Sequence, residues 1–185
     1  MDKMNSLKDH FIISLPHMND TLFKKTVIFI CEHDKHGAMG LIINKKINKK
    51  DISYSNQEND KELIKVLNEN NLFIGGPVLT DRILFLHTIK KINESISINK
   101  EVSVSSDIDT LKSIVNTSNQ QYKLFLGHSG WSRGQLEREI ENGDWLIQKS
   151  INSLIFEKKI NQIWGKAANS LGIEINDISN ITGQS

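Results

Sequence analysis

The chain has 185 residues, 38% of them hydrophobic and 24% charged, which suits one soluble globular domain with a sizeable core. Lys and Arg number 23 and Asp and Glu number 22, giving a net charge of +1. This balance disfavours direct binding to DNA or RNA, because nucleic-acid-binding surfaces usually carry a basic excess.

Two further features indicate where the protein works. Cys31 is the single cysteine, so no intrachain disulfide can form, which fits a reducing compartment. The polar segment 1–10 lacks the apolar core of a signal peptide, and no apolar run approaches the ~20 residues of a membrane span. We therefore expect a cytoplasmic protein with no membrane association.

In the first half of the chain, short apolar runs predict strands. They cover Phe11–Leu15, Val27–Cys31, Met39–Asn44 and Leu72–Ile74. The polar turn Glu32–Gly37 suggests that the second and third runs form a hairpin. Lys45–Asn59 is rich in Lys, Asn and Ser and predicts a surface loop, after which Asp60 can cap a helix with apolar residues at 63, 66 and 67.

The second half predicts a similar mixture. Apolar or alternating runs predict strands at 83–87, 101–105, 122–126 and 145–147. Helices are expected after a cap at Ser106 or Asp107, between Ser132 and Asn142, and over residues 160–171, where Gly172 ends the pattern.

Strands outnumber helices in this reading, and the two kinds are interleaved irregularly, which is typical of an α+β protein. We predict one domain over residues 1–185, built as a layered α/β sandwich with a mixed, mainly antiparallel sheet packed by helices. The 10 N-terminal residues and the segment Asn180–Ser185 are expected to be flexible.

The most distinctive segment is Gly127–Glu137, with the sequence GHSGWSRGQLE. Its three glycines predict a sharp bend between a buried strand and a helix, because glycine tolerates positive φ and close backbone approach. Ser132 and Gln135 have the spacing of a capping box, in which a hydroxyl caps the helix and the glutamine reaches back. We therefore expect a shaped surface at this bend.

This segment contains one candidate for a catalytic nucleophile, Ser129. Ser129 stands between a strand and a helix, where hydrolases of one class place their nucleophile. That turn needs a glycine two residues after the serine, and position 131 is a tryptophan. His128, the immediate neighbour, cannot readily act as the base, because adjacent side chains on an extended chain diverge. A glycine-permitted bend with a helix cap is the simpler interpretation.

Other residues are candidates for a metal site or an anion site. Cys31, His33 and His36 could supply ligands, but a structural zinc site needs four ligands, so a buried cysteine and a polar turn are preferred. The glycines of Gly75-Gly76-Pro77 and of the bend offer backbone N–H groups, yet neither has the spacing of a nucleotide-binding loop. We expect no metal and no cofactor.

Several segments together resemble a known protein family. They are Phe11–Pro16, Cys31–His33, Gly37–Lys45, Gly75–Val78, Leu86-His87, Gly127, Gly130-Trp131, Gly134–Glu137 and Trp145. In order and spacing this set is similar to the AlgH/YqgE family of bacterial proteins, over roughly residues 11–172. The resemblance implies an α/β sandwich in a cytoplasmic bacterial protein. It implies no established biochemical activity, although some members have been linked to transcriptional or virulence regulation.

We therefore hypothesise a non-enzymatic binding or regulatory protein that uses an apolar cleft around the GHSGWSRGQLE segment to bind a protein or a small molecule. The candidate cleft residues are Gly130, Trp131, Gly134, Gln135, Glu137 and Trp145, with Asn44, Gly75, Gly76 and Pro77 as neighbours. The tryptophans would supply contact area and the polar side chains would supply directional contacts. The alternative is a hydrolase that uses histidine and a carboxylate such as Glu137 at the same cleft.

Overall fold

A computed structural model describes residues 6–15, 18–48, 65–66, 72–89, 95–115, 120–157 and 159–172. The helix expected after Asp60 lies outside this set apart from Lys65 and Val66, which are helical. Most of the loop predicted after Lys45, and the C-terminal segment from Asn180, also lie outside it. Among the described residues, no helix is long and apolar enough to cross a membrane.

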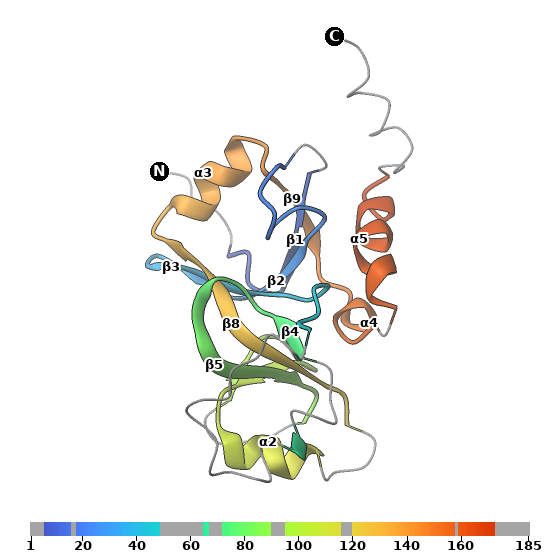
Figure 1. The fold of residues 1–185 in the computed structure, drawn as a ribbon. Coiled ribbons are helices and arrows are strands. Elements are labelled where there is room, and N and C mark those ends of the chain that lie inside the picture. Colours follow the sequence, from blue (N-terminus) through green and yellow to red (C-terminus); the bar gives the residue numbers. More distant parts are fainter. Residues whose placement is uncertain are drawn as a thin grey trace.

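The strands of the described residues form one sheet, in which every pairing of neighbouring strands but one is antiparallel (Figure 1). Its strands are β1 (His10–Ser14), β2 (Val27–Asp34), β3 (Gly37–Ile42), β4 (Leu72–Ile74), β5 (Val78–His87), β6 (Ile96–Ser97), β7 (Ser103–Ser105), β8 (Tyr122–Ser132) and β9 (Trp145–Lys149). They are ordered β6-β7-β5-β8-β3-β2-β1-β9, and β4 joins β8 in parallel. The predicted α+β class is confirmed, but the sheet curls into a half-barrel, a shape that the layered-sandwich prediction did not include.

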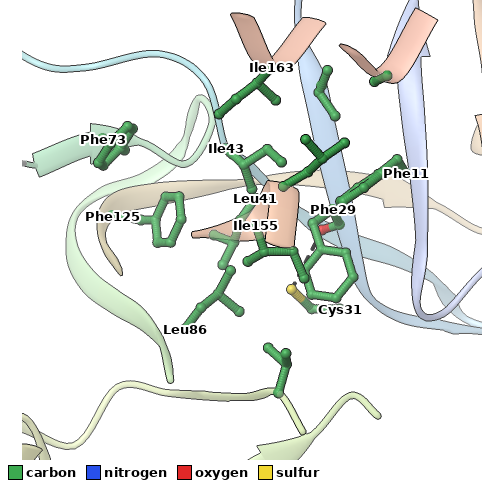
Figure 2. Packing of buried hydrophobic residues seen from close by; sticks show 14 of the residues in the cluster. Phe11, Phe29, Cys31, Leu41, Ile43, Phe73, Leu86, Phe125, Ile155 and Ile163 are labelled. Carbon is green, nitrogen blue, oxygen red and sulfur yellow. Dashed lines mark hydrogen bonds between the residues drawn. The ribbon is translucent and has the colours of Figure 1, made fainter. Parts of the chain in front are cut away.

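The helices are α2 (Ile108–Val115), α3 (Gln135–Glu141), α4 (Asn152–Ile155) and α5 (Ile160–Asn169). Each packs on the sheet through buried apolar side chains. Phe29 and Phe125 belong to the cluster beneath α4 and α5 (Figure 2), whereas Leu111 fixes α2 and Leu136 fixes α3 in two other clusters. Cys31 is fully buried in the first cluster, and burial raises the pKa of its thiol, as expected for a small hydrophobic residue.

Strand β8 corrects the prediction of a bend at 127–134. The strand runs unbroken from Tyr122 to Ser132, and only Gly127 within it has a positive φ, of 66°. The segment is extended because it has a partner on each side: Gly130 lies opposite Met39 of β3, and His128 lies opposite Val78 of β5. Hydrogen bonding to both neighbours therefore outweighs the turn tendency of the glycines.

Gly75 and Gly76 are not a free turn, as their composition suggested, because they cross β8 at very short range. A Cβ atom on Gly75 would lie 2.0 Å from the carbonyl oxygen of Gly127, and one on Gly76 would lie 2.3 Å from the carbonyl carbon of His128. The chain leaves β4, which is parallel to β8, and enters β5, which is antiparallel to it. Only glycine permits this close approach.

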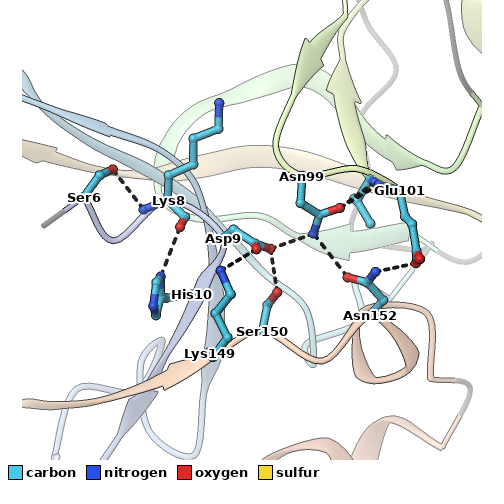
Figure 3. Close-up of polar contacts among 10 residues, drawn as sticks. Ser6, Lys8, Asp9, His10, Asn99, Glu101, Lys149, Ser150 and Asn152 are labelled. Carbon is cyan, nitrogen blue, oxygen red and sulfur yellow. Dashed lines mark hydrogen bonds and ion pairs between the residues drawn. The ribbon is translucent and has the colours of Figure 1, made fainter.

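A polar network around Asp9 joins three distant parts of the chain (Figure 3). The Asp9 carboxylate accepts hydrogen bonds of 2.6 Å from Lys149 Nζ, Ser150 Oγ and Asn99 Nδ2. Asn99 also donates to Asn152 at 3.2 Å. Burial acts to raise the pKa of Asp9, but the hydrogen bonds from its three partners outweigh it and hold that pKa below 3.8. The N-terminal segment is thus tied to β9 and to the turn between β6 and β7.

Candidate functional site

An open pocket of about 510 Å³ lies at the hairpin formed by β2 and β3. It is lined by Lys8, Glu32, His33, Asp34, His36, Gly37, Ala38, Met39 and Trp131. The hairpin pairs tightly, with Asp34 opposite Gly37, so the turn is shorter than the predicted segment Glu32–Gly37. Three stretches far apart in the sequence therefore meet at one pocket: the N-terminal segment, the hairpin and the end of β8.

A bulge in β2 shapes the hairpin side of the pocket. Ile30 lies opposite Gly40 and Glu32 lies opposite Met39, so Cys31 is an extra residue in the ladder. Such a bulge re-aims the side chains that follow it. Cys31 remains in the core, whereas Glu32 lines the pocket, which explains why the cysteine and the following histidines do not form a joint site.

His33 is held rigidly at the pocket by partners on both ring nitrogens. The backbone N–H of Leu7 donates to Nδ1 at 2.8 Å, so Nε2 carries the ring hydrogen. Nε2 then donates to Oε1 of Glu137 at 3.0 Å. The His33 side chain is 5% exposed and that of Glu137 is 28% exposed, so the pair connects the pocket wall with α3.

Behind Trp131, a single carboxylate collects three hydrogen bonds. Oε2 of Glu139 accepts the indole N–H of Trp131 at 2.8 Å and that of Trp145 at 2.9 Å. Oε1 of the same residue accepts a bond from Gln135 Nε2 at 2.9 Å. Glu139 is not among the residues predicted from the sequence, although its position four residues after Gln135 on a helix was a usable signal.

The start of α3 matches only part of the predicted capping box. The helix begins at Gln135, after Gly134 in the left-handed conformation, and no side-chain hydrogen bond caps it. The glutamine half is present, since Oε1 of Gln135 accepts the backbone N–H of Ser132 at 3.0 Å. The hydroxyl half is wrong, because Ser132 Oγ contacts the same Oε1 at 3.2 Å instead of a backbone N–H.

The structure brings some of the predicted cleft residues together. Trp131, Gln135 and Trp145 meet at Glu139, and Glu137 bonds to His33. Trp131 is the member of the predicted set that also lines the pocket. Both tryptophans are largely buried, at 7% and 5% exposure, so they close a core cluster more than they frame an apolar cleft.

The other predicted residues lie elsewhere. Asn44 ties the start of β2, since its Oδ1 accepts the Val27 N–H at 2.9 Å and its Nδ2 donates to the Lys25 carbonyl at 2.8 Å. Gly130 lies beside Val78 and His128. The remaining members have structural positions, at the β8 crossing and at the start of α3: Gly75, Gly76, Pro77 and Gly134.

Ser129 and His128 do not form a catalytic pair. Ser129 is 1% exposed, and its hydroxyl donates to the Gly75 carbonyl at 3.2 Å. His128 alternates to the other face of β8, where burial lowers its pKa. No group of three or more His, Cys, Asp or Glu side chains able to hold a metal occurs within the described ranges.

The chain is similar in sequence to a family of bacterial proteins. Residues 11–176 match the model of the AlgH-like protein family. A UPF0301 protein of Shewanella frigidimarina is 38% identical over 186 residues, covering 97% of this chain and 99% of the relative. A UPF0301 protein of Buchnera aphidicola is 39% identical over 173 residues, covering 91% and 92%.

Solved structures agree with the fold. The solution structure of AlgH from Pseudomonas aeruginosa superposes with a TM-score of 0.75 at 29% identity, covering 100% of this chain and 97% of that one. The crystal structure of protein DIP2367 from Corynebacterium diphtheriae gives a TM-score of 0.69 at 22% identity, covering 92% and 90%. The second likeness concerns the fold alone.

Proposed function

Since the chain belongs to the AlgH-like family, we propose that it acts as a non-enzymatic binding protein whose ligand site is the pocket at the β2–β3 hairpin. The observation that carries the proposal is the convergence of Lys8, the hairpin and Trp131 around about 510 Å³ of open space. A cytoplasmic location and a regulatory role belong to the same proposal. The single buried thiol of Cys31 fits a reducing compartment.

The lining chemistry favours a ligand with a basic group beside an apolar one. Glu32 and Asp34 contribute two carboxylates against the one ammonium of Lys8. The backbone N–H of His36 donates to Asp34 Oδ1 at 2.7 Å and lowers the pKa of that carboxyl, so Asp34 is ionised at neutral pH. Met39 supplies apolar surface to the pocket. Its flexible thioether side chain can adapt to ligands of different shapes. An amine or guanidinium attached to a hydrocarbon matches this lining.

The hydrolase alternative receives no comparable support. Glu137 is engaged by His33, whose second nitrogen is occupied by the Leu7 N–H, so neither ring nitrogen is free to take a proton from a substrate. His128 lies instead beside Gly130 and Val78. A binding role uses the rigidity of the His33–Glu137 pair directly, because a preorganised wall reduces the entropy lost on binding.

A fragment screen observed by ¹⁵N–¹H correlation spectra tests the proposal. Small amines and guanidines with apolar groups should shift amides in the hairpin 32–39, and Glu32→Lys should abolish those shifts. Asp109→Lys makes the same charge change on α2, at a side chain that is 93% exposed, and should leave them unchanged. No shift with any fragment, or equal binding by the Glu32→Lys variant, would refute a basic-ligand site at this pocket.

A further inference from the structure

Residues 6–8 form a short N-terminal strap that lies against the β2–β3 hairpin, next to the pocket. Two groups of the strap bond to His33: Oγ of Ser6 donates to the His33 carbonyl at 2.8 Å, and the backbone N–H of Leu7 donates to Nδ1 of the imidazole at 2.8 Å. The side chain of Leu7 is 6% exposed and packs in the cluster that also fixes α3. Lys8, the last residue of the strap, lines the pocket. The strap therefore contributes to the pocket wall, and His33 holds it there.

The bond from Leu7 to His33 exists only while the imidazole is neutral. A backbone N–H can only donate, so Nδ1 must be the nitrogen of the ring that carries no hydrogen. Protonation adds a hydrogen at that nitrogen, and two N–H groups then face each other across 2.8 Å. The backbone N–H of Leu7 loses its acceptor in a largely buried position. That loss is comparable with what the burial of one leucine side chain contributes to stability.

The other ring nitrogen of His33 responds in the opposite way. Nε2 donates to Oε1 of Glu137 at 3.0 Å, and this bond becomes charge-assisted when the ring is protonated. The other ionisable side chains in the pocket lining are Glu32, Asp34, Lys8 and His36. The two carboxylates favour a charged imidazole, whereas the lysine, and the second histidine when it is protonated, oppose it. Protonation therefore replaces the bond between His33 and the strap by a stronger bond between His33 and α3.

His10 also contacts the strap, but its bond does not depend on charge. Nδ1 of His10 lies 3.0 Å from the carbonyl oxygen of Lys8 (Figure 3). A carbonyl can only accept, so this nitrogen carries a hydrogen in the neutral ring as well as in the protonated one. The N–H of Asp9 donates to the Ile30 carbonyl at 3.0 Å, which attaches the chain to β2 directly after the strap. A change at His33 can therefore release residues 6–8 without disturbing β1.

We propose that His33 is a pH-sensitive switch whose protonation detaches residues 6–8 from the β2–β3 hairpin and withdraws Lys8 from the pocket. Histidine is the side chain that ordinarily changes charge between about pH 5 and about pH 8. The strap is attached at the upper end of this range and free at the lower end. The switch goes beyond the ligand site, because it operates whichever ligand the pocket binds. Only its effect on ligand binding rests on the function proposed above.

Nuclear magnetic resonance of the unmodified protein tests the switch without a ligand. The ¹⁵N chemical shifts of the His33 ring should show an Nδ1 without hydrogen at about pH 8, which gains one as the pH falls to about 5. Over the same titration the heteronuclear NOE of the Leu7 and Lys8 amides should fall, while that of Phe11 in β1 stays high. The proposal is overturned if the strap keeps its NOE after His33 is protonated, or if the ring stays neutral throughout.

A matched pair of substitutions identifies the histidine responsible. His33→Asn keeps an acceptor oxygen at the position of Nδ1 and does not titrate in this range, so the strap should stay ordered at about pH 5. His10→Asn makes the same change at a histidine whose bond to Lys8 an amide can still donate, and it should keep the wild-type pH dependence. If the two variants behave alike, the response does not arise at His33 and the proposal is wrong. Ligand binding enters neither measurement, so failure of the switch and failure of the ligand site are distinguishable.

Discussion

Nε2 of His33, in the β2–β3 hairpin, lies 3.0 Å from Oε1 of Glu137 in α3, although 104 positions separate the two residues in the chain. The bond fixes the hairpin to a helix that otherwise packs through Leu136 and the tryptophan cluster. It also holds the imidazole at the wall of the pocket, with the Leu7 N–H fixing its second nitrogen. The pocket therefore has one wall whose position depends on α3.

Removing the Glu137 carboxylate tests this connection. Glu137→Ala should lower the free energy of unfolding by about 1–2 kcal/mol, because it leaves the nearly buried Nε2–H of His33 without its partner. Glu137→Gln should lose less, since the amide oxygen can still accept that hydrogen. Urea unfolding measures both, and Glu141→Ala on the exposed end of α3 is the control. Equal stability of the Glu137→Ala variant and the control would show that the bond contributes nothing.

Glu139 is expected to be the most sensitive polar residue of α3. Glu139→Ala leaves the indole N–H groups of Trp131 and Trp145 unpaired in a buried cluster, which should cost about 3 kcal/mol. The near-ultraviolet circular dichroism of the tryptophans should change with it, because their ring positions depend on that carboxylate. Glu141→Ala again serves as the control. If the free energy of unfolding falls by less than about 0.5 kcal/mol and the spectrum is unchanged, the Glu139 carboxylate does not hold the two tryptophans in place.

Gly76→Ala probes the crossing over β8. A methyl group there would meet backbone atoms of His128 and Ser129 at 2.3 Å, so we expect a loss of about 3 kcal/mol or failure to fold. Gly143→Ala is a close control, since Gly143 also has a positive φ, of 81°, but has no atom within 4 Å of the added carbon. It should cost about 1 kcal/mol from backbone strain alone. Similar losses in the two variants would mean that the close approach is unimportant.

Lys123 should make stability depend on pH. Its Nζ donates to the carbonyls of Ile43 and Ile155 at 2.7 and 3.1 Å and lies 4.2 Å from the Phe73 ring centre. Burial lowers the pKa of Lys123 to about 7, against the smaller opposing effect of Glu157, while the unfolded chain keeps the ordinary value of 10.5. Between pH 7 and 10.5 the unfolded chain binds the extra proton, so the free energy of unfolding rises with pH.

The variant Lys123→Met isolates that effect. The variant should lose most of the rise in the free energy of unfolding between pH 7 and 10. Relative to the wild-type protein, it should therefore be least stable at high pH and more stable near pH 6. Denaturant unfolding across this range measures the slopes, and Lys35→Met, at an exposed position of the hairpin turn, should keep the wild-type slope. Parallel curves for Lys123→Met and wild type would show that Lys123 titrates normally in the folded protein.

Local patterns were sufficient for much of the fold. The helix expected after Asp107 is present as α2, with the Asp107 carboxylate accepting the Thr110 N–H at 2.8 Å and Leu111 facing the core. The hairpin of β2 and β3 was also predicted correctly, from two apolar runs around a short polar turn. Caps, turns and apolar periodicity act between residues a few positions apart, so the sequence alone contains them.

The remaining features depended on residues that are distant in the chain. The three glycines in segment 127–134 predicted a bend. Strand β8 nevertheless continues through Gly130, because β3 and β5 supply hydrogen-bonding partners on its two sides. In the same way, the bond between Glu137 and His33 and the bonds of Glu139 to two tryptophans depend on where α3 packs against the sheet. The sequence by itself indicated most of the strands and the helices α2, α3 and α5, since those choices rest on local backbone and burial preferences. Tertiary structure decided which distant strands pair with one another and which polar side chains come into contact. It did so because hydrogen bonds and packing across the sheet override local propensity.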